Sequence, residues 1–395
     1  MSKTYNMRKY TFLLLLVSVL LMSACSSSDD INSSRATSST EETVDTTILT
    51  DNYTYELPVI FHVLYNDKND ANQYIPYQRI SNLVQYVNEI YQGGIYGESE
   101  NVHVKFVLAT KDENGKKLEY PGVDYVKYTG EYPIDVEQFM TDETGSNVKY
   151  IWEPNDYINV MMFNFKESNT ESVLLGISHM PNSIKGDHEL AGLETLSTPS
   201  VTKANLPFAY CSAINSLYAN RSAEGGYYQS DRYTNANHQM TFYTSADIVM
   251  TLAHELGHYL GLYHVFTEAA SESNDNSDVN PVDSCADTDY CADTYSYNRA
   301  EYNDYTKYEM NSVQGLDPNL FNKLLLRYSC DSVQYEADNI MDYSICLGYQ
   351  ITPEQKARIR HVLYYSPLIP GPKKYRTTRA ASVAGPVDIK IKTIK

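Results

Sequence analysis

Apolar residues follow two different spacings along the chain, and these spacings predict where strands and helices lie. Continuous or alternating apolar runs typical of strands occupy four segments: 57–65, 101–109, 157–165 and 174–180. Between the first two, apolar residues recur at helical spacing over 76–92 and stop at Gly93 and Gly94. A glycine pair after a periodic run is a common helix end, so we expect a helix there.

The second half of the chain is more irregular and carries two further predicted helices. An apolar stripe runs from Ile248 to Leu260, and Thr244–Asp247 before it has a capping-box pattern. The last helix is expected to begin at Thr352–Gln355, with a capping Thr and Pro at its first position, and to reach about Tyr365. Polar or glycine-rich stretches without periodicity are expected to form loops or irregular structure: 182–240, 267–312 and everything after Pro367.

The N-terminal 24 residues have the pattern of an export signal. Positive residues precede an apolar stretch from Thr11 to Met22, which is too short to span a bilayer and ends in small residues. Because Cys25 follows directly, the segment resembles a bacterial lipobox, which implies cleavage before Cys25 and lipid attachment to its sulfur. An ordinary signal peptide followed by an incidental cysteine is the alternative.

These features predict five segments. Residues 1–24 form a lipoprotein signal peptide, 25–52 a flexible tether, 53–264 an N-terminal lobe with the metal-binding helix, 265–368 a C-terminal lobe, and 369–395 a tail. The tether is Ser/Thr-rich and acidic, so it lacks the apolar surface needed to fold. Acidic residues close behind Cys25 resemble the surface-export signal of Bacteroidota lipoproteins. We therefore expect an exported protein at the outer membrane or cell surface of a Gram-negative bacterium.

Composition narrows the function. The 395 residues carry a net charge of −19, which argues against nucleic-acid binding because phosphates require a basic face. In an oxidising compartment disulfides persist. With Cys25 lipidated, four of the remaining cysteines cluster after residue 280, so two disulfides are expected there, although four cysteines allow three pairings. Cys211 is left over, and we expect a buried free thiol.

The chemistry-bearing motif is His254-Glu-Leu-Gly-His258-Tyr-Leu-Gly261-Leu-Tyr-His264, which fits HExxHxxGxxH at every fixed position. Four residues advance a helix by about 400°, so His254 and His258 share one face. A continuing helix would carry His264 roughly 9 Å further along the axis and away from them. The chain must therefore turn back, and Gly261 permits this because glycine tolerates positive φ.

Three neutral imidazoles and a water form a tetrahedral catalytic zinc site with one open position. Glu255 lies beside the first ligand, where it can act on that water without binding the metal. A bare HExxH also occurs on ordinary amphipathic helices, so Gly261 and His264 carry much of this prediction. A second motif, Asn339-Ile-Met341-Asp-Tyr343, resembles a Met-turn, and its Met341 lies 77 residues after His264.

Together these motifs resemble the pappalysin family of metzincin proteases. The resemblance rests on HELGHYLGLYH, on Asp287-Thr288 beside Cys285 and Cys291, on NIMDYSIC and on Thr352-Pro-Glu-Gln, and more loosely on LPVIFHVLY, EIYQGG and WEPNDYINVMMF. It implies an α+β, two-lobed zinc protease. A twisted, mostly parallel five-stranded sheet would carry a backing helix and the active-site helix, and the C-terminal lobe would be irregular and disulfide-bonded with a Met-turn.

The resemblance also implies roles for single residues. Met341 would pack under the imidazoles, Tyr343 would hydrogen-bond the tetrahedral intermediate, and the strand near 174–178 would pair with extended substrate. The disulfides would be Cys285–Cys330 and Cys291–Cys346. Calcium, present in some relatives, could bind at Asp283, Asp287 and Asp289, although Asp-Thr-Asp replaces the family's Asp-Thr-Pro.

The resulting function is that of a zinc endopeptidase acting on extracellular or surface proteins, with Glu255 as general base and a protein or peptide as its partner. Two alternatives stay open. The chain could be a lipid-anchored protein that binds glycans or host proteins and keeps zinc as structure. It could also be a protease specialised for glycoproteins, which only a comparison of glycosylated and bare substrates would separate from the first function.

Overall fold

The computed structural model describes residues 52–167, 173–186, 188–268, 281–312, 319–373, 385 and 387–395, all within one unit, Asp45–Lys395. The predicted signal peptide, Cys25 and nearly all of the tether lie outside the described residues. No helix in the described part of the chain has the length and apolarity that crossing a bilayer needs.

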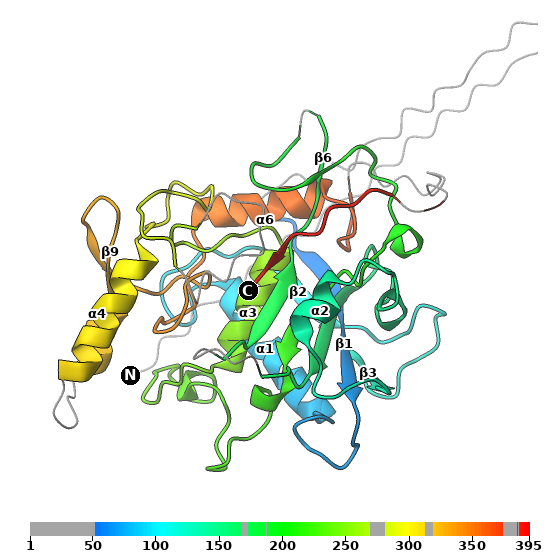
Figure 1. Cartoon of the computed structure of the whole chain (residues 1–395), viewed down its shortest axis with the longest axis horizontal. Helices are drawn as coiled ribbons and strands as arrows, with labels where there is room; N and C mark the ends of the chain where they lie inside the picture. The colour runs from blue at the N-terminus through cyan, green and yellow to red at the C-terminus, as the bar shows by residue number, and fades with distance from the viewer. Residues whose placement is uncertain are drawn as a thin grey trace, which may run out of the picture. The chain divides into compact units, whose positions relative to one another are not determined.

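A mostly parallel sheet forms the centre of the fold, as expected, and its strand order is β11-β5-β8-β4-β1-β2 with β3 also paired to β1 (Figure 1). The central strands are β1 (Tyr55–Tyr65), β2 (Val104–Leu108), β3 (Val123–Lys127), β4 (Ile158–Phe163), β5 (Gly176–His179), β8 (Ser212–Asn215) and β11 (Thr393–Ile394). Short two-stranded sheets are formed by β6 (Ser183–Ile184) with β7 (Thr195–Leu196), and by β9 (Leu326–Tyr328) with β10 (Gln334–Glu336).

The length of β1 organises this sheet. Its first half pairs in parallel with β2 and its second half with β3, while β4 pairs along its other side. Six consecutive residues of β1, Val59 to Leu64, are buried, which is why the sequence reads as a continuous apolar run rather than an alternating one. Only β5 and β11 run antiparallel to their neighbours.

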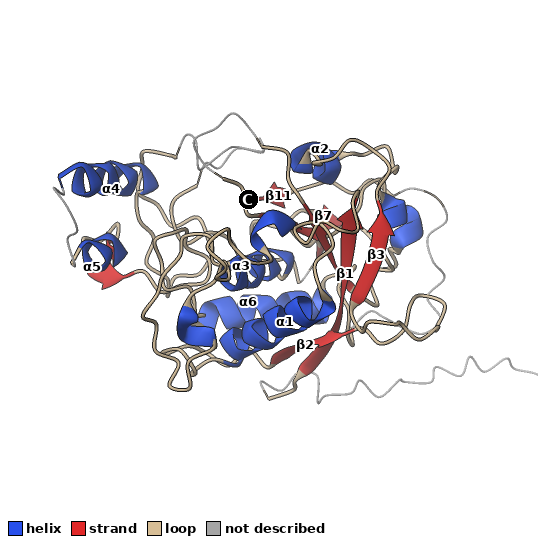
Figure 2. Cartoon of the chain, turned by 90° about the horizontal axis from the view of Figure 1, so that it is seen from below, coloured by secondary structure: helices blue, strands red, loops and turns tan. Residues whose placement is uncertain are grey.

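Helices α1 (Tyr77–Gln92) and α3 (Ile248–Tyr259) pack against each other beside the sheet, and Tyr91 Oη donates to Ala253 O at 3.0 Å between them. Figure 2 shows α1, α3 and α6 (Pro353–Tyr365) on one side of β1 and β2. The remaining helices are α2 (Val136–Thr141), α4 (Arg299–Ser312) and α5 (Leu320–Leu325). Both predicted ends hold: α1 stops at Gly93, and Thr352 and Gln355 form the capping box of α6.

Several predictions were wrong in detail. The sheet has seven strands instead of five, because β3 continues the line of β2 and β11 adds an edge outside β5. Strand β8 lies inside 182–240, and α4 lies inside 267–312, both expected to be loops. Helix α3 has no capping box at Thr244. Instead Asp247 is the N-cap residue, and its carboxylate accepts from the backbone N–H groups of Val249 and Met250.

The cysteine prediction is half right. Cys285 and Cys330 form a disulfide. Cys291 and Cys346 are buried and free, so the second predicted bond is wrong. The thiol of Cys346 instead lies against backbone groups, within 3.3 Å of Asn339 O and 3.2 Å of Gly348 N. Cys211 is a buried free thiol, as expected.

Candidate metal centre and catalytic cleft

Helix α3 delivers the first two histidines from a fixed start. Asp247 is 3% exposed, and its Oδ1 accepts from Val249 N at 3.0 Å and Met250 N at 3.3 Å, while Oδ2 accepts from Ser230 N at 2.8 Å. An N-cap carboxylate satisfies otherwise unpaired helix N–H groups and is favoured by the helix dipole. Because this cap is buried and hydrogen-bonded, it fixes the start of α3 at Asp247, seven residues before His254.

The side chains of His254, His258 and His264 meet at their Nε2 atoms. These atoms are 3.0 Å apart between His254 and His258, 3.1 Å between His258 and His264, and 3.2 Å between His254 and His264. One ion can reach three nitrogens so spaced at the roughly 2.0–2.1 Å of a zinc–imidazole bond. Within the described residues, this is the one group of three or more His, Cys, Asp or Glu side chains placed to share an ion.

The second ring nitrogen of each histidine fixes its protonation. The Nδ1 atoms of His254, His258 and His264 lie 2.7, 2.8 and 2.7 Å from three acceptors, which are Ile340 O, Leu262 O and Glu268 Oε1. Carbonyl and carboxylate oxygens only accept, so each Nδ1 carries the proton and each Nε2 keeps a lone pair. Three lone pairs therefore converge on one point, and a cation is what such an arrangement stabilises.

Burial keeps the imidazoles of His254 and His258 neutral. Burial, with the neighbouring His264, lowers the pKa of His254 to about 3. Burial also holds the pKa of His258 well below its ordinary value. Neutral imidazole is the metal-binding form, so His254 and His258 need not lose a proton near pH 7 to bind an ion.

Two glycines of the motif make room for this geometry. At Gly261 φ is +95°, and the turn there brings Leu262 O to His258 Nδ1 and carries His264 back to the other histidines. At Gly257 a Cβ atom would lie 2.5 Å from the sulfur of Met341. Met341 is fully buried and thus lies directly against α3, where the sequence placed the floor of the site.

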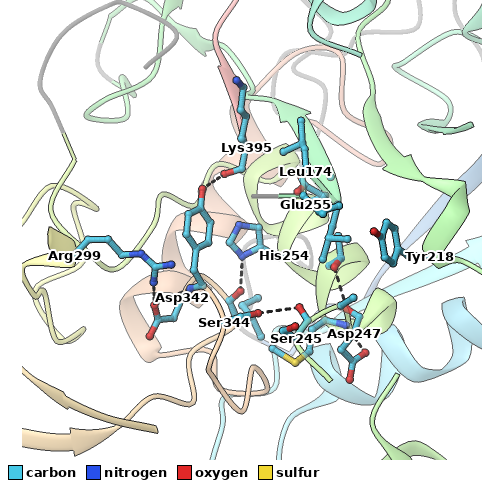
Figure 3. A pocket seen from close by; sticks show the side chains of 18 residues that line it. Leu174, Tyr218, Ser245, Asp247, His254, Glu255, Arg299, Asp342, Ser344 and Lys395 are labelled. Carbon is cyan, nitrogen blue, oxygen red and sulfur yellow. Dashed lines mark hydrogen bonds and ion pairs between the residues drawn. The ribbon is translucent and has the colours of Figure 1, made fainter. Parts of the chain in front are cut away.

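Glu255 lies at the wall of a cavity of about 500 Å³ that is also lined by His254, Gly176 and Tyr343 (Figure 3). Glu255 is 2% exposed, and its Oε2 has no hydrogen-bond partner among the described residues. Burial raises the pKa of this carboxyl well above its ordinary value. A cation held by the adjacent imidazoles would favour the ionised form and oppose this shift.

Tyr343 lies next to the histidines. Its ring centroid is 4.6 Å from that of His264 and 5.8 Å from that of His254. The guanidinium of Arg299 stacks over the Tyr343 ring at 4.7 Å, and the hydroxyl group donates to Lys395 O. The phenol ring is thus packed against the imidazole of His264 and the guanidinium of Arg299, and Tyr343 lines the cavity.

Sequence reasoning missed two residues of this site. Glu268 lies four residues after His264, and its carboxylate orients the His264 imidazole. A carboxylate four residues after a metal-binding histidine is a spacing that could have been recognised in the sequence as a supporting pair. Gly176 on β5 faces Glu255, and a Cβ there would lie 2.4 Å from Glu255 Oε1. No sequence signal marks Gly176, because its role depends on a contact across 79 residues of chain.

The calcium prediction finds no support. The carboxylates of Asp283, Asp287 and Asp289 each accept hydrogen bonds from protein groups, and the side chains of Asp287 and Asp289 also interact with each other. Asp283 binds Asn298 Nδ2 at 2.9 Å, and Asp287 binds the backbone N–H of Asp289 at 3.2 Å. Asp289 itself binds the Cys291 backbone N–H and the Thr294 hydroxyl.

Replacing Glu268 with alanine is expected to weaken zinc binding by about 10–100-fold, because His264 loses the acceptor that orients it. Competition with a chromogenic chelator measures this affinity. Glu98→Ala, which removes one carboxylate from an exposed position, is the matched control and should leave the affinity unchanged. Equal affinities for the two variants would show that Glu268 does not support the site.

Comparison with known proteins agrees with this geometry. Residues 214–364, which include the three histidines and the Met-turn, match a peptidase family described as Pregnancy-associated plasma protein-A. No curated protein sequence matches the chain. Among solved structures, mature mirolysin of Tannerella forsythia in complex with a cleaved peptide is 19% identical, at a TM-score of 0.45, over 78% of this chain and 90% of that chain.

A promirolysin variant from the same organism is also 19% identical, at a TM-score of 0.45, over 79% of this chain and 81% of that chain. The matched segment supplies every fixed position of the HExxHxxGxxH motif and the methionine packed under it. The family match over residues 214–364, together with the site that these residues form, identifies this part of the chain as a metalloendopeptidase of the pappalysin type.

Proposed function

We propose that the chain is a zinc-dependent endopeptidase that hydrolyses peptide bonds of extracellular or surface proteins. The observation that carries this proposal is the convergence of three Nε2 lone pairs beside Glu255, a buried carboxylate with an unpartnered oxygen, at an open cavity. A structural zinc site would usually close its fourth position with a protein ligand and would need neither the carboxylate nor the cavity.

His254, His258 and His264 would hold a zinc ion, which would supply a Lewis acid to polarise a carbonyl group and to lower the pKa of water. The chain's own residues handle the protons. Glu255 accepts a proton from the attacking water at Oε2 and returns it to the nitrogen of the leaving amine. The hydroxyl group of Tyr343 donates to the carbonyl oxygen as negative charge develops on it.

Strand β5 orients the substrate in this proposal. It runs antiparallel to β8, and its first residue, Gly176, borders the cavity together with Leu174 and Leu175 just before the strand. An extended peptide can add to such an edge through main-chain hydrogen bonds, which bind many sequences and fix the direction of the chain. Because Gly176 has no side chain, the peptide and Glu255 can approach each other closely at this point.

The site of action follows from the N-terminal segment. The lipobox-like sequence before Cys25 supports attachment of the mature chain to a membrane through that cysteine, with residues 26–52 as a tether. In a Gram-negative host that processes lipoproteins, the full chain is expected in the membrane fraction and Cys25→Ser in the soluble fraction. Ser26→Ala should behave like the native chain. A Cys25→Ser chain that stays in the membrane fraction would refute the anchor.

Glu255→Gln is expected to keep zinc and to lower kcat/KM by about 10²–10⁴-fold, because the amide has the shape of the carboxylate but cannot accept the proton. The assay is digestion of casein by residues 26–395, with zinc content measured in parallel. Chelation should abolish cleavage by the native chain.

Two further variants give the assay its controls. Glu98→Gln makes the same chemical change at an exposed position and should cleave like the native chain. Tyr343→Phe should lower kcat more than it raises KM, since the hydroxyl group acts on the developing charge. A Glu255→Gln chain that cleaves casein as fast as the native chain would contradict the proposed function.

A further inference from the structure

The last described residues of the chain pair with β5, the strand along which the substrate would bind in the proposed function. Thr393 and Ile394 pair antiparallel with His179 and Ser178 of β5, and Met180 N donates to Lys392 O at 2.8 Å. Ile394 is 8% exposed, so this strand is packed against the core and is not loosely laid on it. This segment, β11, is the edge strand of the sheet beside β5, and Figure 1 draws it in red next to the C marker.

The segment then enters the catalytic cavity. Lys395 lines the same cavity as His254 and Glu255 (Figure 3). Its carbonyl oxygen accepts a hydrogen bond from the hydroxyl group of Tyr343. In the proposed function this hydroxyl group donates to the substrate carbonyl oxygen instead. A strand that only covered the edge of β5 would have no reason to reach this hydroxyl group. While Lys395 holds it, a substrate carbonyl cannot.

The register of the pairing shows how a substrate would continue. Since Thr393 lies opposite His179 and Ile394 opposite Ser178, Lys395 comes opposite Ile177. The next residue of a peptide in this register would come opposite Gly176, the position where a Cβ would touch Glu255. Residues up to Lys395 thus occupy the half of the cleft that precedes the bond to be cut.

Side chains hold the segment at two further points, both through lysine. Lys395 Nζ lies 2.5 Å from Glu137 Oε1 at the end of the segment, and the Lys395 side chain is 15% exposed. Lys392 Nζ lies 2.7 Å from the hydroxyl group of Tyr263. Glu137 is not among the residues that line the cavity, and its side chain is 55% exposed. Its carboxylate makes the surface at the end of this segment complementary to a basic side chain.

We propose that this half of the cleft is a binding site for an extended, lysine-bearing peptide, and that the chain's own residues 392–395 occupy it and compete with substrate. The competition with substrate rests on the proposed function, whereas the peptide-binding site itself does not depend on it. Glu137 is the residue that selects the basic side chain, and Ile394 is the apolar anchor.

Loosening the segment in the full chain tests the competition. Ile394→Asp places a charge at a buried position of β11 and should lower KM for a lysine-containing fluorogenic peptide about tenfold with kcat unchanged, because an internal competitor acts on KM alone. Lys390→Asp introduces the same residue at an exposed position of the same segment and is the control, with no change in KM. An unchanged KM in Ile394→Asp, with the fold retained in thermal unfolding, would overturn the inference.

A binding measurement separates this inference from the proposed function. In a Glu255→Gln background, a fluorescein-labelled peptide with the sequence of residues 387–395 should bind the Ile394→Asp chain about tenfold more tightly than the chain with its native segment. Equal binding by both, or binding by neither, would overturn the inference. If the peptide binds the Ile394→Asp chain more tightly than the chain with its native segment, while the native chain never cleaves casein, the binding site is supported and the proposed function is wrong.

The lysine preference has its own test in the same assay. Glu137→Lys should weaken binding of the labelled peptide several-fold, and a peptide with glutamate in place of its last lysine should recover the affinity. Unchanged binding of the native peptide by Glu137→Lys would show that the site does not select a basic side chain.

Discussion

The structure depends on three imidazoles that are each forced to point a lone pair at the same place. Each Nδ1 donates to a fixed acceptor, so each Nε2 is left unprotonated within 3.2 Å of the other two. Burial keeps His254 and His258 neutral, and among the described residues each Nε2 atom has only the other two Nε2 atoms as hydrogen-bonding neighbours. This constraint explains the surrounding architecture better than packing alone: the protein stabilises an arrangement that is favourable only with a cation in place.

Each nearby element can be understood as a support for that arrangement. The buried Asp247 cap fixes the start of α3, and Gly261 turns the chain so that Leu262 O reaches His258. Helix α6 holds the turn from below, because Arg358 Nε donates to Gly261 O at 2.6 Å. The Met-turn contributes twice, through the Met341 side chain against Gly257 and through Ile340 O on His254. Supports from four separated parts of the chain meet at one site.

Much of this could be predicted from the sequence where the information is local. The zinc-binding helix, its glycine turn, the Met-turn and the caps of α1 and α6 are each encoded within a dozen residues. What failed is non-local or only weakly patterned. Strand β8 has four residues with polar ends, and α4 buries only Arg299 and Tyr302, so neither shows a clear period. Apolar and polar residues do alternate over 387–391, but this alternation breaks before Ile394 and its polar positions include a lysine. The sequence therefore did not predict β11, which is stabilised by its pairing with β5. Partners such as Gly176 and the free thiol of Cys346 are set by contacts that no spacing reveals.

Anomalous diffraction from crystals of residues 26–395, measured on both sides of the zinc absorption edge, tests the central claim most directly. The account predicts a single anomalous peak at about 2.0–2.1 Å from the Nε2 atoms of His254, His258 and His264, with Glu255 outside bonding distance and no fourth protein ligand. A peak that includes Glu255 or another side chain as a fourth ligand would indicate a closed structural site. The absence of a peak in zinc-loaded crystals would contradict the account altogether.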